Sequence, residues 1–302
     1  MLQTQRQIHA FPDIRKGLVD YGLVIALSVI WGVAFVAIRR AEFELSPPNL
    51  TVLRWLIASA GFLILAPVYG RPKKPLQRRH VPRLLLVSFA SVLGYHLSLN
   101  YAETIVSSGL AGLLISFGPI FIVILSSLFL KEKIGKMLIL ALGLAVIGAI
   151  ILSINTDMTF LQITGPLGVI LAAFMYSVYS VGSKPLVKEY GATATAILAA
   201  VIGTAFTLPL ISSSFISQVA NLSVTGWLSV GYLAIISTVM ANMILYTLIG
   251  SRTVSKLGVQ LYLIPVVSLV GGILLLGESF SVLTVVGAGF LLLGAGLATH
   301  KH

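Results

Sequence analysis

The sequence contains few charges and no cysteine. Only 10% of its 302 residues are Asp, Glu, Lys or Arg, whereas 57% are hydrophobic. A soluble domain carries about 25% charged residues, and so small a share cannot solvate the surface of a chain of this size. This excludes a soluble globular protein and a disordered chain. The lack of cysteine excludes disulfides, thiolate nucleophiles and cysteine-ligated metals, but it does not identify the redox compartment.

Long apolar runs fill most of the chain, whose mean hydropathy is +1.02. Each run has the roughly 20 residues that cross about 30 Å of hydrocarbon as a helix. The runs lack the two-residue alternation of barrel strands and are about twice as long. The sequence therefore predicts an all-α integral membrane protein with short loops. We expect ten transmembrane helices, at residues 18–38, 48–69, 81–103, 107–130, 134–154, 165–187, 193–216, 224–249, 254–276 and 282–299.

Basic residues fall on alternate loops of this arrangement. With the N-terminus inside, seventeen Lys and Arg lie in inside segments, and only Arg39 and Arg40 lie in outside loops. Because Lys and Arg are retained in the cytoplasm, both termini are expected to be cytoplasmic in a multi-pass cell-membrane protein. This retention also explains the net charge of +11 without a nucleic-acid partner. Residues 1–21 show no apolar core followed by a small-residue cleavage site, so we expect no cleaved signal peptide and expect the first span to serve as the signal.

The two halves of the chain align at an offset of 146 residues, without gaps from His96 to Ala149. The informative matches are of Pro, Glu and Gly, which are costly or scarce within membrane spans. A chance alignment of two hydrophobic regions is the alternative. The matches pair Pro119 with Pro265, Glu132 with Glu278, Gly143 with Gly289, Gly148 with Gly294 and Gly112 with Gly258.

An odd number of helices in each repeat predicts that the second copy is inverted in the membrane. We expect a cytoplasmic N-terminal segment at 1–17, a first five-helix repeat at 18–154, an external linker at 155–164 and a second, inverted repeat at 165–299. The loop charges agree, since residues 71–79 are basic and their counterparts at 217–223 are uncharged. Two inverted halves can exchange conformations around a midplane site, which is the architecture of alternating access.

Several short motifs occur in a fixed order along the chain. They are residues 31–39 (WGVAFVAIR), 54–58 (RWLIA), 119–121 (PIF) and 130–134 (LKEKI), together with the paired glycines of spans five and ten. Together they resemble the EamA-type family of the drug/metabolite transporter superfamily, a ten-helix inverted repeat, over nearly the whole chain. The second copy departs from the pattern at Met175 and Tyr176, where a Trp-small pair is expected. The resemblance implies export of amino acids or other metabolites, with proton exchange as one option, and does not choose a substrate.

The third span carries a polar stripe. His96, Asn100 and Glu103 lie at i, i+4 and i+7, on one helix face. A polar stripe facing lipid is costly, so this face should meet a cavity or a neighbouring helix. The 146-residue offset maps His96 onto Asn242 and Asn100 onto Tyr246. Two such pairs would make a central polar site; interhelical hydrogen bonding is the alternative.

Aromatic and uncharged polar residues complete the candidate site. Tyr and Trp offer an apolar face and a hydrogen-bond donor, and their faces attract cations. An interfacial aromatic belt is the alternative, to which Tyr69 and Trp227 belong. Tyr95 and Tyr101 are further aromatic candidates. The predicted substrate-binding residues are Trp31, Phe35, His96, Asn100, Ser116, Tyr176, Tyr179, Asn242, Tyr246, Gln260 and Tyr262.

Proton coupling has two candidate residues. His96 is the only histidine within a predicted span, and histidine titrates near neutral pH. Glu103 lies near the outer end of its span, where solvation is the alternative. The first span has no central carboxylate, which excludes a mechanism built on one.

Other span residues suggest movement or packing. Gly118, Pro119 and Pro265 predict either hinges or packing kinks, because proline removes a backbone hydrogen bond. Glu132 and Glu278 begin the fifth and tenth helices and are interpreted as caps of these helices. Arg54 lies about 9 Å from the outer end of its helix and can extend to the surface, which makes a role in binding a substrate carboxylate the weaker interpretation.

The absent motifs narrow the function. No phosphate-binding GxxxxGK[ST] loop and no metal-ligand cluster occurs, so no cofactor is predicted. The sequence predicts a secondary active transporter, not an enzyme, that exports a small amino acid or other metabolite by alternating access. Neutral, zwitterionic or organic-cation cargo is favoured. The expected partners are this metabolite and membrane lipid, for a monomer or homodimer.

Two other functions remain open at this stage. An intramembrane enzyme acting on a lipid-linked substrate would need a reactive carboxylate and histidine, and only Glu103 and His96 could begin such a pair. They lie about 10 Å apart along the helix axis, too far for a direct hydrogen bond. A channel is disfavoured because the polar stripes are short and interrupted.

Overall fold

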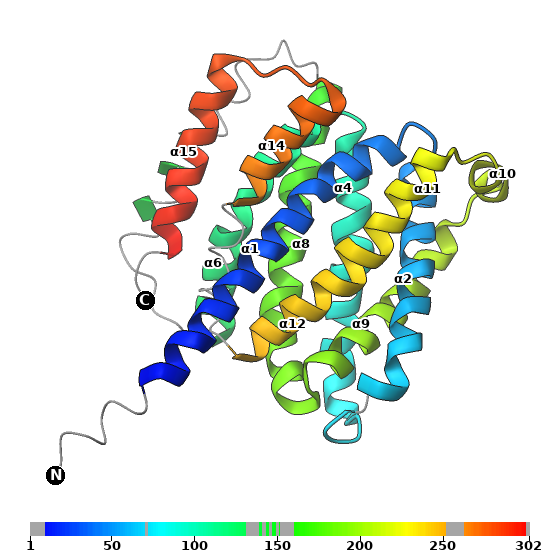
Figure 1. The fold of residues 1–302 in the computed structure, drawn as a ribbon, viewed down its shortest axis with the longest axis vertical. Coiled ribbons are helices and arrows are strands. Elements are labelled where there is room, and N and C mark those ends of the chain that lie inside the picture. The colour runs from blue at the N-terminus through cyan, green and yellow to red at the C-terminus, as the bar shows by residue number, and fades with distance from the viewer. Residues whose placement is uncertain are drawn as a thin grey trace.

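The computed structural model describes residues 10–69, 72–130, 139–140, 143–144, 147–148, 151, 160–251 and 263–299. Every regular element in these ranges is helical, which confirms the predicted all-α class (Figure 1). The longer helices are α1 (Ala10–Ala41), α2 (Pro47–Tyr69), α3 (Val81–Ser88), α4 (Tyr95–Glu103), α5 (Ser108–Leu114), α6 (Gly118–Leu130), α8 (Phe160–Tyr190), α9 (Ala192–Thr207), α10 (Phe215–Ala220), α11 (Val224–Gly231), α12 (Ala241–Ser251), α14 (Leu263–Leu276) and α15 (Val282–Thr299).

Several of these helices join end to end into membrane-length rods. Within the described residues, seven rods are long and apolar enough to span a bilayer: Gly22–Ala41, Pro47–Pro67, Arg78–Glu103, Ser108–Phe129, Ile163–Tyr190, Ala192–Leu210 and Val224–Ile249. Ile264–Leu276 and Val282–Gly294 are shorter apolar helices. The chain is therefore a multi-pass membrane protein. Most of the fifth predicted span lies outside the described residues, as does the start of the ninth, so the total of ten remains a prediction.

Three helix boundaries differ from the sequence-based ones. Helix α1 already begins at Ala10, and α8 begins at Phe160, within the segment predicted as a linker. The rod Ala192–Leu210 ends at Leu210, whereas the corresponding predicted span ends at residue 216. There Pro209 lies in a short 3₁₀ helix, and three serines follow before α10 begins. Proline and serine both favour chain reversal over helix continuation, which explains the earlier end.

The rods Arg78–Glu103 and Val224–Ile249 share a rare distortion. The segment η2 (Phe89–Gly94) joins α3 to α4 as a π-helix, and η5 (Tyr232–Met240) joins α11 to α12 in the same way. Residues 89–94 and 235–240 are related by the 146-residue offset. Extended π-helices are rare and occur frequently at functional sites. Their recurrence at equivalent positions is a structural sign of the internal repeat.

Helix α14 packs closely against two helices of the first half. A Cβ at Gly32 of α1 would lie 2.4 Å from Val267 Cβ, and one at Gly112 of α5 would lie 1.8 Å from Ser268 Oγ. Only glycine permits these approaches, because any Cβ would overlap its neighbour. The two halves of the chain therefore interlock, and Figure 1 shows α14 beside α1.

Glu278 strengthens this contact from the segment after α14. Its carboxylate accepts hydrogen bonds from the backbone N–H groups of Ser108 (2.8 Å) and Gly109 (3.2 Å), and from the Ser108 hydroxyl (3.0 Å). The prediction that Glu278 caps the tenth helix is therefore wrong, since it caps α5 of the other half. The helix start that attracts the carboxylate is the one nearest in space. Glu132 lies outside the described residues.

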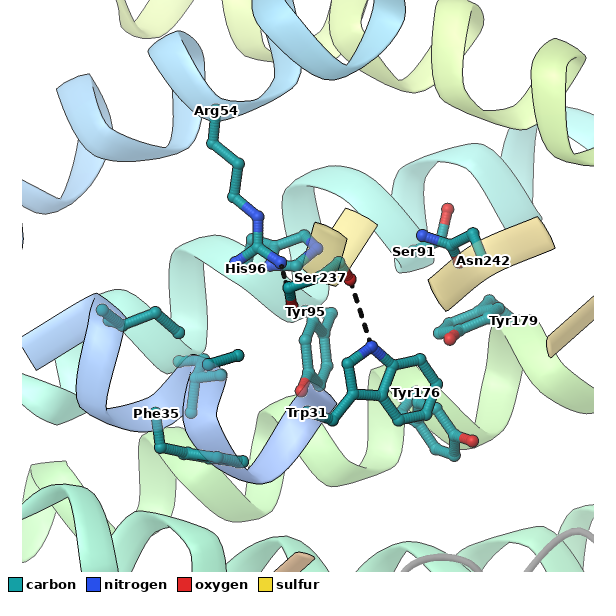
Figure 2. A pocket seen from close by; sticks show the side chains of 13 residues that line it. Trp31, Phe35, Arg54, Ser91, Tyr95, His96, Tyr176, Tyr179, Ser237 and Asn242 are labelled. Carbon is teal, nitrogen blue, oxygen red and sulfur yellow. Dashed lines mark hydrogen bonds between the residues drawn. The ribbon is translucent and has the colours of Figure 1, made fainter. Parts of the chain in front are cut away.

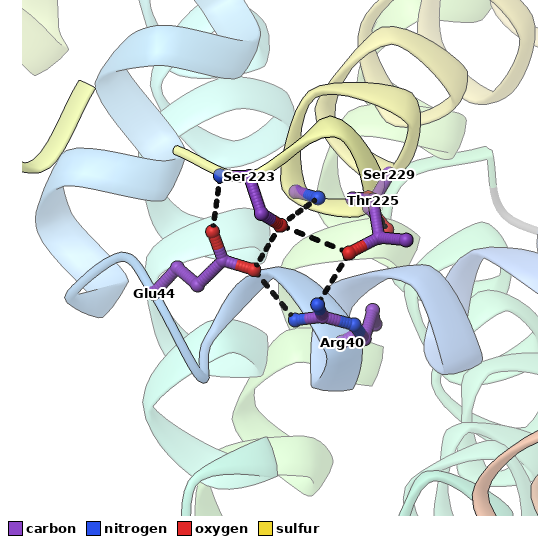
Figure 3. Close-up of polar contacts among 6 residues, drawn as sticks. Arg40, Glu44, Ser223, Thr225 and Ser229 are labelled. Atoms are coloured by element: carbon purple, nitrogen blue, oxygen red, sulfur yellow. Dashed lines mark hydrogen bonds and ion pairs between the residues drawn. The ribbon is translucent and has the colours of Figure 1, made fainter. Parts of the chain in front are cut away.

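Two contacts between the halves lie at opposite ends of the bundle. At one, which we call the Glu44 end, the turn after α1 contacts the start of α11 (Figure 3). At the other, which we call the Tyr190 end, the last residue of α8 contacts Gln77, just before the 3₁₀ helix Arg78–His80. Residues 44 and 190, and residues 77 and 223, are each 146 apart. The same contact between halves thus occurs twice, once at each end of Figure 1.

Candidate functional site

A cavity lies between the two halves, lined by side chains of α1, α2, η2, α4, α8, η5 and α12 (Figure 2). Its empty space, including the opening, is about 480 Å³. The structure brings together six of the eleven predicted substrate-binding residues: Trp31, Phe35, His96, Tyr176, Tyr179 and Asn242. The cavity is also lined by Arg54, Ser91, Tyr95 and Ser237, and by the apolar residues Ala34, Ile38 and Leu99.

Aromatic rings form one wall of the cavity. Trp31 meets Tyr176 edge to face at 5.7 Å between ring centroids, and Tyr176 meets Tyr179 at 5.1 Å. The Trp31 indole N–H donates to the backbone carbonyl of Ser237 (3.2 Å), which fixes this ring across the two halves (Figure 2). Tyr176 and Tyr179 are each 4% exposed. These rings therefore do not belong to an interfacial belt.

The two π-helical segments supply equivalent residues to the cavity. Ser91 and Ser237 are 146 residues apart, as are His96 and Asn242, and all four line the wall. A π-turn widens the helix and redirects the side chains that follow it. Asn242 Nδ2 donates to the Thr238 carbonyl (2.9 Å) within the distorted stretch. The predicted pairing of His96 with Asn242 at one site is thus observed as a shared cavity wall.

His96 lies between two aromatic rings. Its centroid is 5.1 Å from that of Trp55 and 4.8 Å from that of Tyr95, both in edge-to-face geometry. Its Nδ1 is buried and has no hydrogen-bond partner in the described part of the chain. The imidazole is therefore held by ring packing, and its polar atoms are not committed to a neighbouring helix.

Arg54 points inward from α2. The side chain is 3% exposed, its Nε donates to Thr238 Oγ1 (2.9 Å), and its Nη2 donates to Ser237 Oγ (3.3 Å). The expectation that Arg54 extends to the outer surface is wrong, because hydroxyl groups on η5 offer closer partners. Figure 2 shows the guanidinium directed to the cavity beside His96.

Three predicted residues are described but do not line the cavity. Asn100 is fully buried and donates from Nδ2 to Thr51 Oγ1 of α2 (2.9 Å). Ser116 and Tyr246 are 1% and 2% exposed and are also packed away from the wall. A spacing of four residues rotates a side chain about 40° around a helix, enough for His96 and Asn100 to meet different neighbours. Gln260 and Tyr262 lie outside the described residues.

The predicted hinge at Gly118 and Pro119 coincides with a change of helix type. The 3₁₀ helix Ile115–Phe117 separates α5 from α6, which begins at Gly118 next to Pro119. The Ser177 hydroxyl of α8 donates to the Gly118 carbonyl (3.0 Å). Pro265 lies in the first described turn of α14, and its carbonyl accepts from Ser268 Oγ (3.0 Å). The rods are locally irregular at Pro119, and movement there remains a prediction.

Two buried carboxyl groups lie near the Glu44 end. Glu103 is fully buried, so the interpretation that it is solvated is wrong. Neither its oxygens nor those of Glu42 have a hydrogen-bond partner within the described ranges. Arg39 donates to the backbone carbonyl of Glu103 instead. Burial raises the pKa of Glu42 to about 9, although Arg39 acts in the opposite direction.

Burial therefore favours the protonated form of the Glu42 carboxyl group in this conformation. This group is close enough to Glu103 for two negative charges to repel each other. The sequence gives no sign that Glu42 is buried, because a glutamate in a turn after two arginines is typical of a solvated loop. Within the described ranges, no group of three His, Cys, Asp or Glu is placed to hold a metal ion.

Known proteins similar to this chain are transporters. An uncharacterized transporter of Archaeoglobus fulgidus is 31% identical over 93% of this chain and 99% of its own length. A probable terminal-alkyne amino-acid exporter of Streptantibioticus cattleyicolor is 29% identical, with 93% of each chain covered. A probable amino-acid metabolite efflux pump of Escherichia coli is 25% identical over 91% of this chain and 93% of its own length.

A solved crystal structure shares the fold. It has a TM-score of 0.65 and 18% identity, and the match covers 93% of this chain and 96% of the other. The model of the EamA-like transporter family matches the sequence twice, at residues 20–154 and 163–299. These two matches cover the two halves that enclose the cavity, and the chain belongs to the EamA-like transporter family.

Proposed function

We propose that this chain is a secondary active transporter that exports a small amino acid or a related metabolite by alternating access. The observation that carries the proposal is the cavity wall, to which Ser91, Ser237, His96 and Asn242 contribute as two equivalent pairs. A site shared by two similar halves can be exposed to either side as the halves exchange conformations. The named activities of the amino-acid exporter and the efflux pump support the direction and the cargo.

The proposed architecture is two inverted five-helix repeats with ten spans in the cell membrane and both termini in the cytoplasm. The equivalent contacts at the Glu44 and Tyr190 ends support the inversion, because related residues lie at opposite ends of the bundle. The strong excess of Lys and Arg in the predicted inside segments supports the orientation. The Glu44 end then faces outward and the Tyr190 end inward.

Proton exchange is the proposed coupling, with Glu103, Glu42 and His96 as carriers. Glu103 and Glu42 are carboxyl groups without hydrogen-bond partners in the described part of the chain. Opening of the Glu44 end would hydrate them and favour release of the Glu42 proton, because hydration removes the burial that raises its pKa. Closure would favour protonation again. His96, on the cavity wall, would link this event to the substrate.

Transport by the purified protein in liposomes tests the proposal. The vesicles are loaded with pooled labelled amino acids and related metabolites, and release is followed with and without a pH step. We expect release of unaltered amino acid, accelerated by the pH gradient. Trp31→Ala should reduce the rate about tenfold or more, because it removes one aromatic wall. Trp227→Ala is the control, since Trp227 is 43% exposed and lies off the cavity.

The same assay separates the alternatives. Recovery of chemically altered compound would favour the intramembrane enzyme. Equal release from loaded vesicles with and without the protein would contradict transport of the compounds tested. Glu103→Gln and Glu42→Gln should abolish the response to the pH step while Glu189→Gln, at the other end, keeps it; a full response in both variants would contradict the coupling.

A further inference from the structure

Arg54 is the one permanently charged side chain among the residues that line the cavity. Burial of a charge within a membrane protein is costly, so such residues are found in pairs or at functional sites. Arg54 is only 3% exposed, so the protein buries nearly all of this residue. The negative charge that balances the guanidinium must come either from another side chain or from a bound ligand.

The described residues provide no direct counter-ion. Their two ion pairs are Arg40 with Glu44 and Lys74 with Glu189, and neither involves Arg54. The hydrogen-bond acceptors of Arg54 are the neutral hydroxyl groups of Thr238 and Ser237.

The other polar and charged groups around Arg54 act at longer range. Glu103 interacts with Arg54 electrostatically, and so do the hydroxyl groups of Tyr95 and Tyr232, without forming an ion pair or a hydrogen bond with it. A guanidinium carries five N–H donors, and the two hydrogen bonds use only part of this capacity. The remaining donors are available to a ligand that enters the cavity.

The two hydroxyl groups also orient the guanidinium. Thr238 and Ser237 lie in the π-helical segment η5, and Thr238 Oγ1 donates to the Leu233 carbonyl (2.7 Å), which leaves its lone pairs for Arg54. Ser237 offers its backbone carbonyl to Trp31 and its hydroxyl to Arg54. A single turn of η5 therefore fixes both the aromatic wall and the positive charge.

We propose that Arg54 binds the carboxylate of the transported molecule and that the substrate class is carboxylate-bearing metabolites, zwitterionic amino acids among them. This inference rests on the proposed transport function and refines its substrate. A guanidinium matches a carboxylate in shape and binds it through two parallel hydrogen bonds. The aromatic wall of Trp31, Tyr95 and Tyr176 then receives the apolar part of the molecule. Organic cations, which the sequence left open as cargo, are disfavoured by the same charge.

The experiment compares each carboxylate with the amide of the same shape, in which an uncharged group replaces the carboxylate. The thermal unfolding temperature of the purified full chain in detergent is measured during titration with benzoate and benzamide, L-phenylalanine and L-phenylalaninamide, and L-leucine and L-leucinamide. We expect at least one carboxylate to stabilise the wild-type protein at concentrations about tenfold or more below those of its amide, because a ligand stabilises the state it binds.

Three variants assign the effect to Arg54. Arg54→Gln should weaken the effective carboxylate about tenfold or more and remove the preference over the amide. Arg54→Lys keeps the charge but loses the forked geometry, so it should retain the preference with weaker binding. Arg83→Gln removes an exposed arginine of α3 and should leave the titration unchanged. If Arg54→Gln does not fold, the comparison of wild type with Arg54→Lys still tests the proposal.

Two results would overturn the inference. One is a panel in which no carboxylate stabilises the protein more than its amide. The other is an unchanged preference in Arg54→Gln or, if Arg54→Gln does not fold, carboxylate binding by Arg54→Lys that is as tight as in the wild type. Neither result contradicts the transport proposal if vesicles still release labelled compounds. Release of amides and esters at the same rate as their acids would show directly that transport occurs without a preference for carboxylates. If vesicles release no labelled compound but the purified protein still prefers carboxylates in the thermal titration, transport is rejected and the carboxylate-binding site is retained.

Discussion

The Glu44 end and the Tyr190 end make the same contact with different chemistry. At the Glu44 end, a carboxylate accepts from the backbone N–H and the hydroxyl of Ser223 (both 2.7 Å) and pairs with Arg40 (2.8 Å). At the Tyr190 end, a neutral phenol accepts from the backbone N–H of Gln77 (3.1 Å). In both halves the same backbone N–H, that of Ser223 or of Gln77, donates a hydrogen bond. The side chain that accepts it differs, being Glu44 at one end and Tyr190 at the other.

The further partners of Glu44 and Tyr190 also differ in charge. Arg40 also donates to Thr225, so a charged network crosses the Glu44 end (Figure 3). The Tyr190 hydroxyl instead forms a hydrogen bond with His80 Nδ1 (2.6 Å), and Tyr190 is 1% exposed. One end is therefore held by partly hydrated charges and the other by a buried neutral group. The two ends should respond differently to pH, salt and substitution.

The response of the Glu44 end to acid follows from its pKa. Hydrogen bonds from the Ser223 backbone and hydroxyl, and then Arg40, lower the pKa of Glu44 below its usual 4.5. A carboxyl group with a depressed folded-state pKa contributes stability above its unfolded pKa and loses it as pH falls through the folded value. The Glu44 end should therefore hold at neutral pH and weaken below about pH 4, near the ordinary pKa of glutamate.

Among the substitutions at the two ends, Glu44→Ala is expected to change the opening of its end most. The substitution removes a charged acceptor from two hydrogen bonds and an ion pair, at a cost of about 1.5 kcal/mol. Opening of the Glu44 end should become about tenfold more favourable. The chain has no cysteine, so Ser237→Cys on the cavity wall provides a single reporter. Its reaction with a membrane-impermeant maleimide from the Glu44 side should accelerate about tenfold.

Glu44→Gln is the matched control for that variant. It keeps an acceptor oxygen of similar size and removes the charge, so its reporter rate should lie between those of the wild type and Glu44→Ala. An unchanged rate in Glu44→Ala would show that this contact does not hold the end closed.

Tyr190→Phe should have a smaller effect at the opposite end. The variant keeps the buried ring but leaves the Gln77 N–H without its acceptor, at a cost of about 1 kcal/mol. Reaction of the Ser237→Cys reporter from the Tyr190 side should accelerate about fivefold, with the rate from the Glu44 side unchanged. Acceleration from both sides would contradict two separate contacts and would indicate general loosening of the bundle.

The sequence predicted the helices far better than the distortions within them. Apolar runs near 20 residues located each of the seven rods and the two shorter apolar helices that the structure describes, because hydrocarbon thickness fixes span length. The π-helical segments Phe89–Gly94 and Tyr232–Met240 were not predicted. A local widening of the turn leaves the apolar composition unchanged, so hydropathy carries no signal of it.

Pseudo-symmetry predicted two residue pairs, of which one lines the cavity, since Asn100 and Tyr246 do not reach its wall. Three-dimensional packing decided the rest. The offset between halves paired His96 with Asn242, and both line the cavity. Distance along α2 suggested that Arg54 could reach the surface, but only the structure shows the hydroxyl groups of η5 beside it. Asn100 shares a helix face with His96, yet Thr51 of α2 provides it with a closer partner.

The smallest effect is expected from Arg40→Gln, which removes the cation and leaves the Glu44–Ser223 hydrogen bonds in place. An ion pair this exposed contributes about 0.5 kcal/mol, so the reporter rate from the Glu44 side should rise only about twofold. Because salt screens exposed charges, about 1 M salt should bring the wild-type rate close to that of the variant. At the Tyr190 end, the hydrogen bonds of Tyr190 contain no ion pair and the exposed Lys74–Glu189 pair beside them contributes little, so the response to salt should be smaller there. A tenfold rise in Arg40→Gln would instead mean that the ion pair, and not the cap on Ser223, holds the Glu44 end.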